Sequence, residues 1–208
     1  MTKVLYVKAN PKEDQFSFSA RVANEFINTY KEKNSSDEIE VLDLYSTNLP
    51  LIDRDVLNAW GKIAAGGELT ENENAKVSRL VELVDQFLAA DKVVFSAPMW
   101  NFGYPPLMKA YLDALCVAGK TFKYTENGPV GLAGDKSVAL IEARGGIYSE
   151  GPAMEVEHTE SFFKTIMGFI GINNVQTVLV EGVAIDPSKA EDIVGEAASK
   201  AIELAKQF

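Results

Sequence analysis

Cysteine and histidine are nearly absent from this chain of 208 residues, which has one of each, Cys116 and His158. A single cysteine excludes an intrachain disulfide, and one His with one Cys cannot build a zinc site of the usual ligand spacing. Cys116 lies in the apolar stretch Tyr111 to Val117, where a small buried hydrophobic residue is a simpler interpretation than a reactive thiolate. We therefore expect no metal site.

Positive charge is also scarce. The chain has 20 Lys and Arg against 30 Asp and Glu, which gives a formal net charge of −10. Nucleic-acid affinity comes largely from basic side chains that displace counterions from the phosphate backbone. The charge balance therefore argues against a nucleic-acid partner.

Long apolar runs are missing as well. No run approaches the roughly 18 apolar residues of a membrane-spanning helix, and the segment after Met1 lacks the long apolar core of a secretory signal. Hydrophobic residues nevertheless make up 47% of the chain and charged residues 24%, an ordinary globular mixture that excludes disorder. We expect a cytoplasmic protein with no membrane partner.

Two kinds of segment alternate along the chain. Short apolar runs rich in β-branched residues predict strands at Val4 to Ala9, Ile39 to Leu42, Val93 to Ala97, Val138 to Ala143 and Val175 to Val180. Helical patterns lie between them, at Ser19 to Lys33, Asp55 to Ala65, Glu71 to Ala90, Pro105 to Val117, Glu155 to Ile170 and Pro187 to Lys206. Thr70 with Glu73 predicts a capping box, and Asp186 before Pro187 predicts another helix start.

The near-continuous hydrophobicity of the predicted strands is typical of a parallel sheet covered on both faces. Because parallel neighbours need helical crossovers, the alternation predicts an α/β fold, a doubly wound five-stranded parallel sheet in the order 2-1-3-4-5. Gly66 and Gly67 separate two surface helices, and Glu126 to Gly134 is expected to form a loop. Since no linker separates two apolar cores, we expect residues 1–208 to form a single domain.

Ligands of such sheets bind beyond the carboxyl ends of the strands, where the strand order reverses. The first loop there begins at Asn10 and ends in Ser17-Phe18-Ser19 at a predicted helix start. The chain has neither a Gly-x-Gly-x-x-Gly fingerprint nor a Walker P-loop. Two hydroxyls and free amides at a helix N-terminus nevertheless suit a phosphate. The alternative is a capping Ser beside a solvated Ser.

The second loop follows the third predicted strand and is rich in aromatic residues. It contains Pro98, Met99, Trp100, Asn101 and Phe102. Exposed rings would be costly without a flat apolar partner, and an amide beside them can hydrogen-bond the edge of a heterocycle. This loop therefore predicts a planar ligand, unless Trp100 and Phe102 merely plug the end of the sheet.

The third loop follows the fourth predicted strand and reads Ala143, Arg144, Gly145, Gly146. Paired glycines permit positive φ and close backbone approach, so their amides can meet a carbonyl-rich ring edge, although such a pair is most often only a turn. In the expected order the three loops leave adjacent strands. A ligand with one phosphate and one flat heterocycle, FMN, fits all three.

Four segments together resemble the FMN-dependent NADH azoreductases of bacteria, which are flavodoxin-like homodimers that also reduce quinones. They are Lys3 to Ala9 with Ser17-Phe18-Ser19, Ala97 to Phe102, Thr121 to Pro129, and Ala143 to Gly146. The resemblance covers essentially the whole chain. It implies one tightly bound FMN per chain, with its phosphate at Ser17 to Ser19 and its ring held by Met99 to Phe102 and Ala143 to Gly146. One departure is Asn10, where the family often has a Ser.

Residues outside the three loops also have candidate roles. Tyr124, Asn127 and Phe162 are expected to line the substrate face, although the loop that holds Tyr124 and Asn127 has a purely structural alternative. His158 is expected at the surface or a dimer edge rather than as a base. Arg144 either contacts the flavin through its backbone or pairs with a carboxylate. Of the adjacent Phe162 and Phe163, one is expected to face the core and the other a partner subunit or the flavin cleft.

The leading hypothesis is an enzyme in which NADH passes hydride to flavin N5 and leaves. An azo compound, cleaved to aromatic amines, or a quinone then takes two electrons at the same face, in a ping-pong mechanism without a catalytic protein residue. The alternative is a non-enzymatic electron carrier of the flavodoxin type, against which stand the extra length from Ile52 to Ala65 and the bulky loops. A signalling receiver is disfavoured, because the loops after the first and third predicted strands lack its acidic residues.

Overall fold

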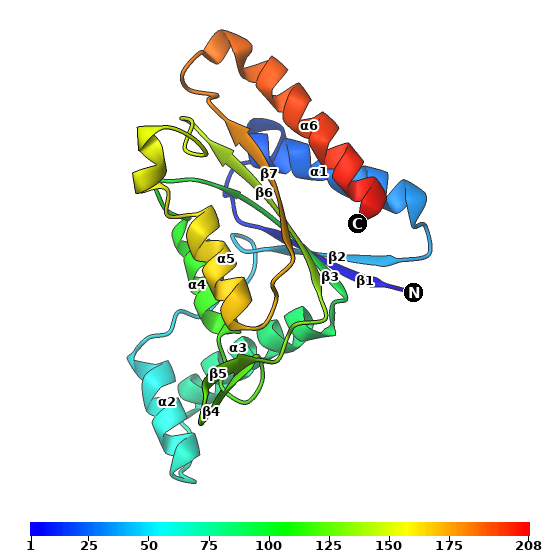
Figure 1. The fold of residues 1–208 in the computed structure, drawn as a ribbon. Helices are drawn as coiled ribbons and strands as arrows, with labels where there is room; N and C mark the ends of the chain where they lie inside the picture. The colour runs from blue at the N-terminus through cyan, green and yellow to red at the C-terminus, as the bar shows by residue number, and fades with distance from the viewer.

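The computed structural model describes residues 1–208, and its centre is a five-stranded sheet in which every neighbouring pair of strands is parallel. The strands lie in the order β2-β1-β3-β6-β7 (Figure 1). Their bounds are β1 (Lys3–Lys8), β2 (Glu38–Asp43), β3 (Lys92–Pro98), β6 (Ser137–Arg144) and β7 (Val175–Glu181). Counted within this sheet alone, the order is 2-1-3-4-5, so the expected doubly wound α/β fold is confirmed.

Helices cover both faces of the sheet (Figure 1). The helices α1 (Phe18–Lys33) and α6 (Ala190–Gln207) pack on one face, and α3 (Glu71–Ala89), α4 (Pro106–Leu115) and α5 (Glu160–Phe169) on the other. The remaining helix, α2 (Arg54–Ala64), packs against α3. No helix of the structure has both the length and the apolar character needed to cross a membrane.

The strand β3 shows why the predicted strands are apolar throughout. Val93 and Phe95 belong to the core beneath α3, α4 and α5, whereas Val94 belongs to the core beneath α1 and α6. Successive side chains of a strand point to opposite faces, so a strand between two helical layers needs an apolar residue at every position.

Two expected helix starts are present in the structure. Thr70 and Glu73 form the capping box at the start of α3, since each side chain accepts a hydrogen bond from the other residue's backbone N–H. The side chain of Asp186 accepts from the N–H of Ser188, but it caps a short 3₁₀ turn, Pro187–Lys189, before α6 begins at Ala190. The position of the second start is confirmed, while its first turn is tighter than an α-helix.

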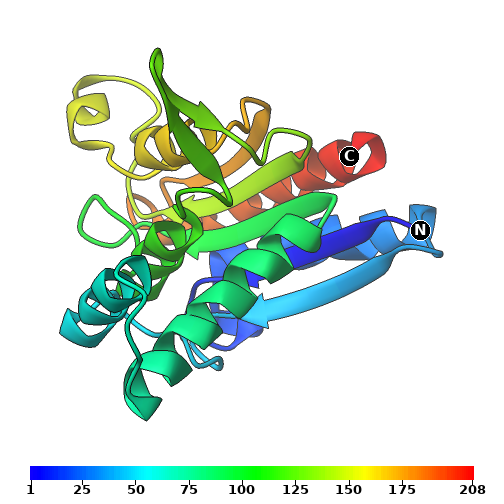
Figure 2. The same ribbon diagram turned by 90° about the horizontal axis from the view of Figure 1, so that it is seen from below.

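A β-hairpin occupies part of the segment that was expected to be a loop. The strands β4 (Phe122–Thr125) and β5 (Gly128–Gly131) pair in antiparallel fashion, and Figure 2 shows them projecting away from the main sheet. The hairpin docks through a very close approach of two backbones, because a Cβ atom added to Gly131 would lie 2.1 Å from the backbone nitrogen of Gly171. Only glycine fits at Gly131.

The helix expected from Glu155 begins later than predicted. Residues Pro152–Val156 form a 3₁₀ helix, and α5 begins at Glu160. The carboxylate of Glu157 accepts hydrogen bonds from the backbone N–H groups of Thr159 and Glu160 at 2.7 Å each, and from that of Ser161 at 3.1 Å. This carboxylate satisfies donors that every helix start leaves free, so it fixes where α5 begins.

Candidate functional site

The three loops singled out in the sequence meet at the carboxyl edge of the sheet. The backbone N–H of Met99 donates to the carbonyl of Ala143 at 2.8 Å, and that of Ala9 donates to the carbonyl of Ser96 at 2.9 Å. Between the loops lies a cavity of about 140 Å³, called here the strand-end cavity. It is lined by Asn10, Lys12, Phe16, Ser17, Phe18, Ser19, Pro98, Met99, Trp100, Ala143, Arg144, Gly145 and Val183.

Three of these lining residues were missed by the sequence analysis. Lys12 and Phe16 belong to the first loop, where a cation beside the serine hydroxyls was already a usable signal for an anion. Val183 follows β7, the fifth strand of the sheet, in a loop whose sequence carries no ligand motif. Three predicted residues do not line the strand-end cavity, namely Asn101, Phe102 and Gly146.

The two serines of the first loop are both buried. Ser17 and Ser19 are only 2% and 1% exposed. The alternative of a capping Ser beside a solvated Ser is therefore wrong about the solvated Ser. The Oγ of Ser17 caps α1 by accepting from the N–H of Ala20, and it also accepts from the Nδ2 of Asn10 at 2.8 Å and lies 3.2 Å from the Oγ of Ser19.

The start of α1 offers further donors. The backbone N–H groups of Phe18 and Ser19 make no backbone hydrogen bond, as is normal for the first turn of a helix. Free N–H groups, the positive end of the helix dipole and the nearby Lys12 all favour a negative charge in the strand-end cavity.

The second loop forms a tight turn with unusual backbone geometry. Trp100 and Gly103 exchange two backbone hydrogen bonds, of 2.8 and 3.0 Å, and the residues between them have positive φ, 48° at Asn101 and 67° at Phe102. Positive φ is strained for a residue such as Phe, and strain of this kind gathers at functional sites. Trp100 is 40% exposed and Phe102 47%, so the alternative that these rings plug the sheet end is wrong.

The third loop presents free amides, but not by the expected backbone conformation. Neither Gly145 nor Gly146 has the positive φ that paired glycines permit. Both glycines lie against close neighbours. A Cβ atom added to Gly145 would lie 3.3 Å from the Cβ of Ala184, and one added to Gly146 would lie 3.1 Å from the ring of Tyr148. Their carbonyls accept hydrogen bonds from Ala184 and Gly182, whereas their N–H groups donate none to the backbone.

The side chain of Arg144 pairs with carboxylates, which is one of the two roles that the sequence left open. Its Nε lies 2.6 Å from Glu142, one terminal nitrogen 3.0 Å from Glu181 and the other 3.2 Å from Glu157. Burial raises the pKa of Glu142, although Arg144 acts in the opposite direction. Burial also acts to raise the pKa of Glu157, but its hydrogen bonds prevail and lower that pKa to about 2.

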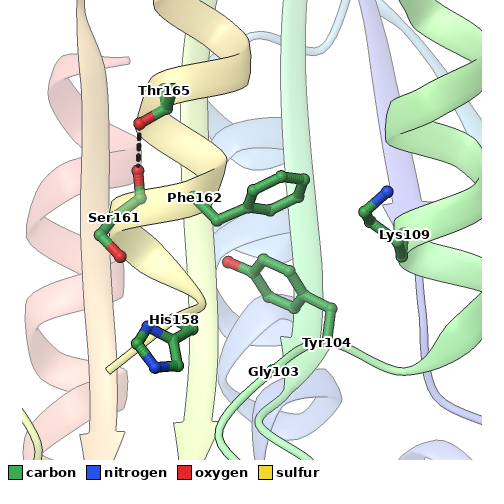
Figure 3. Close-up of a pocket in the computed structure, with 7 residues that line it drawn as sticks. All are labelled: Gly103, Tyr104, Lys109, His158, Ser161, Phe162 and Thr165. Carbon is green, nitrogen blue, oxygen red and sulfur yellow. Dashed lines mark hydrogen bonds between the residues drawn. The ribbon is translucent and has the colours of Figure 1, made fainter. Parts of the chain in front are cut away.

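A second hollow lies beyond the Phe102 turn and is called here the α4–α5 cavity. It has a volume of about 550 Å³ and is lined by Gly103, Tyr104, Lys109, His158, Ser161, Phe162 and Thr165 (Figure 3). The backbone N–H of His158 donates to the carbonyl of Phe102 at 3.1 Å, so this cavity adjoins the aromatic loop. His158 lies at the cavity wall, where no hydrogen bond fixes its imidazole.

Aromatic rings and the ammonium of Lys109 face the α4–α5 cavity, and the hydroxyls of the cavity are already paired. The hydroxyl of Tyr104 donates to Glu142, that of Ser161 to the carbonyl of Glu157, and that of Thr165 to the carbonyl of Ser161. The ammonium of Lys109 lies 5.5 Å from the ring centroid of Phe162. The cavity therefore offers rings and one ammonium group rather than free hydroxyls.

Of the adjacent phenylalanines of α5, one faces the core, as expected. Phe163 is fully buried and packs edge-on against Phe95 of β3, with ring centroids 4.9 Å apart. Phe162 lies in the α4–α5 cavity, and Figure 3 shows its ring beside that of Tyr104. Tyr124 and Asn127, by contrast, belong to the projecting hairpin and line neither cavity, and Tyr124 is 75% exposed.

The lone cysteine is half-buried. Cys116 packs against the core beneath α3, α4 and α5, and burial raises the pKa of its thiol. Both observations confirm the interpretation of Cys116 as a small hydrophobic residue.

Comparisons with known proteins agree with this geometry. Residues 2–205 match a family described by its flavodoxin-like fold. The chain is 48% identical over 208 residues to an FMN-dependent NADH:quinone oxidoreductase of Staphylococcus haemolyticus, with both chains fully covered. It is 50% identical over 211 residues to FMN-dependent NADH:quinone oxidoreductase 2 of Bacillus subtilis, again with full coverage of both.

Two solved structures are similar over the whole chain. An azoreductase from Bacillus anthracis superposes with a TM-score of 0.94 at 45% identity, with both chains fully covered. An FMN-dependent NADH-azoreductase from the same species, solved in complex with FMN, superposes with a TM-score of 0.94 at 36% identity, covering 100% of this chain and 99% of that one.

Proposed function

Because the chain belongs to the flavodoxin-like fold family, we propose that it is an FMN-dependent oxidoreductase that uses NADH to reduce quinones and azo compounds. The observation that carries the proposal is the meeting of three loops at one sheet edge. One loop has buried hydroxyls and free amides, one has half-exposed rings, and one has free glycine amides.

The residues present fit FMN. Ser17, Ser19 and the first amides of α1 suit its phosphate, with Asn10 acting through its hydrogen bond to Ser17. Trp100 and Phe102 offer apolar surface to its ring. The free N–H groups of Gly145 and Gly146 suit the carbonyl-rich edge of the same ring.

FMN, when bound, supplies the hydride and electron transfer that no side chain here provides. The chain binds the phosphate, orients the ring and offers the α4–α5 cavity to the acceptor, where Phe162 and Tyr104 give a flat molecule apolar contact. One NADH supplies the two electrons that convert a quinone to its hydroquinone. Cleavage of an azo bond to two amines takes two equivalents of NADH, with the remaining protons from solvent.

The electron-carrier alternative is not proposed. The full-length relatives are named as oxidoreductases, and a carrier has no use for a substrate-sized hollow beside its ring.

We expect steady-state kinetics to follow a ping-pong pattern, because the chain shows one site at the strand ends and no fingerprint for a separate nucleotide site. With NADH and 1,4-benzoquinone varied together, double-reciprocal plots should give parallel lines. Intersecting lines would indicate a ternary complex and would contradict the shared site.

The proposed working unit is a homodimer. The strand-end cavity, at about 140 Å³, is smaller than the ~300 Å³ lower range of small-molecule sites, so the flavin ring extends beyond it and needs a cover. Exposed apolar side chains also suit a second copy, among them Leu57, Trp60 and Ile63 of α2. Because Tyr124 and Asn127 line neither cavity of their own chain, they reach a substrate only across such an interface.

Sedimentation velocity at micromolar concentration tests this assembly. We expect a species of about twice the 22.7 kDa chain mass, since cyclic dimers are the commonest assembly and the exposed α2 residues need a partner. A monomer that still reduces quinone with NADH would contradict the dimer and the cover it provides.

A further inference from the structure

Arg144 is wholly buried at the end of β6, among acidic side chains from three separate segments. We call these the Arg144 cluster: Arg144, Glu142, Glu157, Thr159 and Glu181. A buried guanidinium is retained only where its donors are matched, and its planar fork can serve several carboxylates at once. Each of the three glutamates that pair with Arg144 also contacts a different part of the candidate site.

Glu181 connects Arg144 to the loop that follows the glycine pair. Its Oε1 accepts from Arg144 at 3.0 Å and from the backbone N–H groups of Tyr148 and Ser149 at 2.9 and 3.1 Å. The hydroxyl of Ser149 also donates to the other oxygen of Glu181. This carboxylate therefore fixes the chain directly after Gly145 and Gly146, whose amides are proposed to meet the flavin.

Glu157 connects Arg144 to the wall of the α4–α5 cavity. It caps α5, the helix that carries Phe162, and directly precedes His158. The hydroxyl of Thr159 donates to Glu157 at 2.6 Å and lies within hydrogen-bonding reach of Glu142 as well. The first turn of α5 is therefore connected to the end of β6 through charged groups, in addition to the apolar packing of Phe163.

Glu142 connects the cluster to the aromatic loop. Its Oε1 lies 2.6 Å from the Nε of Arg144, and its Oε2 accepts from the hydroxyl of Tyr104 at 2.9 Å. Tyr104 directly follows the strained turn at Asn101 and Phe102. Through these three carboxylates, the side chain of Arg144 thus connects the aromatic loop and the glycine loop to the wall of the α4–α5 cavity.

We propose that Arg144 is a positioning residue. It holds the glycine loop and the aromatic loop in the positions that flavin binding requires. It also holds the first turn of α5 in the position that acceptor binding requires. The inference rests on the proposed function. It assigns no contact between the guanidinium and a ligand, because all the side-chain partners of Arg144 are carboxylates and a hydroxyl of this chain.

The variant Arg144→Lys tests the proposal while keeping the charge. An ammonium cannot bridge Glu142, Glu157 and Glu181 together, so the loops lose their common partner while the buried carboxylates keep a cation. We expect the Kd for FMN to rise about tenfold or more, the worth of one charge-assisted hydrogen bond. The matched control is Arg79→Lys, a partly buried arginine remote from the strand ends that also donates to Thr47, Asn48 and Glu82, and we expect it to leave the Kd unchanged.

Two milder variants separate positioning from general stability. Ser149→Ala loosens the connection through Glu181, so it should raise the Kd for FMN and leave the KM for 1,4-benzoquinone unchanged at saturating FMN. Thr159→Val loosens the connection through Glu157 and removes one hydrogen bond to Glu142, so it should raise that KM by a larger factor than it raises the Kd. A role in stability alone would lower the melting temperature of both variants without this division.

The outcomes are distinguishable. If the parent chain binds FMN and Arg144→Lys binds it equally tightly with an unchanged KM, the positioning role is wrong. If Arg144→Lys does not fold, the division between Ser149→Ala and Thr159→Val supports the proposal, and its absence overturns it. A parent chain that binds no FMN overturns the proposed function and this inference with it.

Discussion

Replacing both Ser17 and Ser19 with alanine is expected to weaken FMN binding by roughly 100-fold or more, since each hydrogen bond to a charged group is worth about 1.5–3 kcal/mol. Both hydroxyls are buried at the start of α1, beside amides without a backbone partner. Folding should suffer less, because losing the Ser17 cap costs helices about 1 kcal/mol.

Fluorescence titration of the apoprotein with FMN measures the first effect, and urea unfolding of the apoprotein measures the second. Ser199→Ala is a matched control, since its hydroxyl bonds only to a helix carbonyl on α6. A double variant that holds FMN as tightly as the parent would show that the phosphate lies elsewhere.

Replacing Arg144 with methionine is expected to cost about 3–5 kcal/mol of unfolding free energy at neutral pH, the usual penalty for leaving a buried charge without its partner. Glu142 is fully buried and loses the only cation that pairs with it. Arg79→Met should cost far less, because the partner carboxylate of Glu82 is solvent-exposed and stays hydrated when Arg79 is lost.

The unfolding free energy lost in Arg144→Met is expected to become smaller as the pH falls. Burial raises the pKa of Glu142, and without Arg144 the pKa rises further, so the folded variant takes up a proton as the pH falls and regains stability.

In the parent protein, Glu157 has the opposite effect on the pH dependence of stability. Its pKa falls from 4.5 to about 2 on folding, so its contribution to the free energy of unfolding is complete above pH 4.5 and is lost between pH 4.5 and 2.

Urea unfolding of parent and variant at several pH values between about 8 and 5 measures the difference. We expect the stability gap to narrow as the pH falls, and the added change Glu142→Gln to narrow it at neutral pH. A gap that is the same at every pH would mean that buried carboxylate charge is not the cause.

The sheet and its two helical layers were predictable because their signals are local. Val93, Val94 and Phe95 are apolar in succession, which only a strand covered on both faces requires. Thr70 and Glu73 carry the start of α3 in four consecutive residues. The same holds for the site, since the hydroxyls of the first loop and the rings of the second lie next to predicted strand ends.

The features that were missed depend on contacts between distant residues. The hairpin docks where Gly131 meets Gly171, and no short pattern announces that approach. The start of α5 depends on Glu157, whose carboxylate caps the helix and also pairs with Arg144 on another element. The two roles of Arg144 stayed open in the sequence because Glu142, Glu157 and Glu181 come together only in the fold.

The central claim is that one FMN at the strand ends serves NADH and the acceptor in turn. Anaerobic titration of the purified protein with NADH, followed by 1,4-benzoquinone, tests it most directly. We predict about one FMN per chain, with visible absorbance that NADH bleaches before any acceptor is present and that the quinone restores. A protein without FMN, or absorbance that changes only when both substrates are present, would contradict the claim.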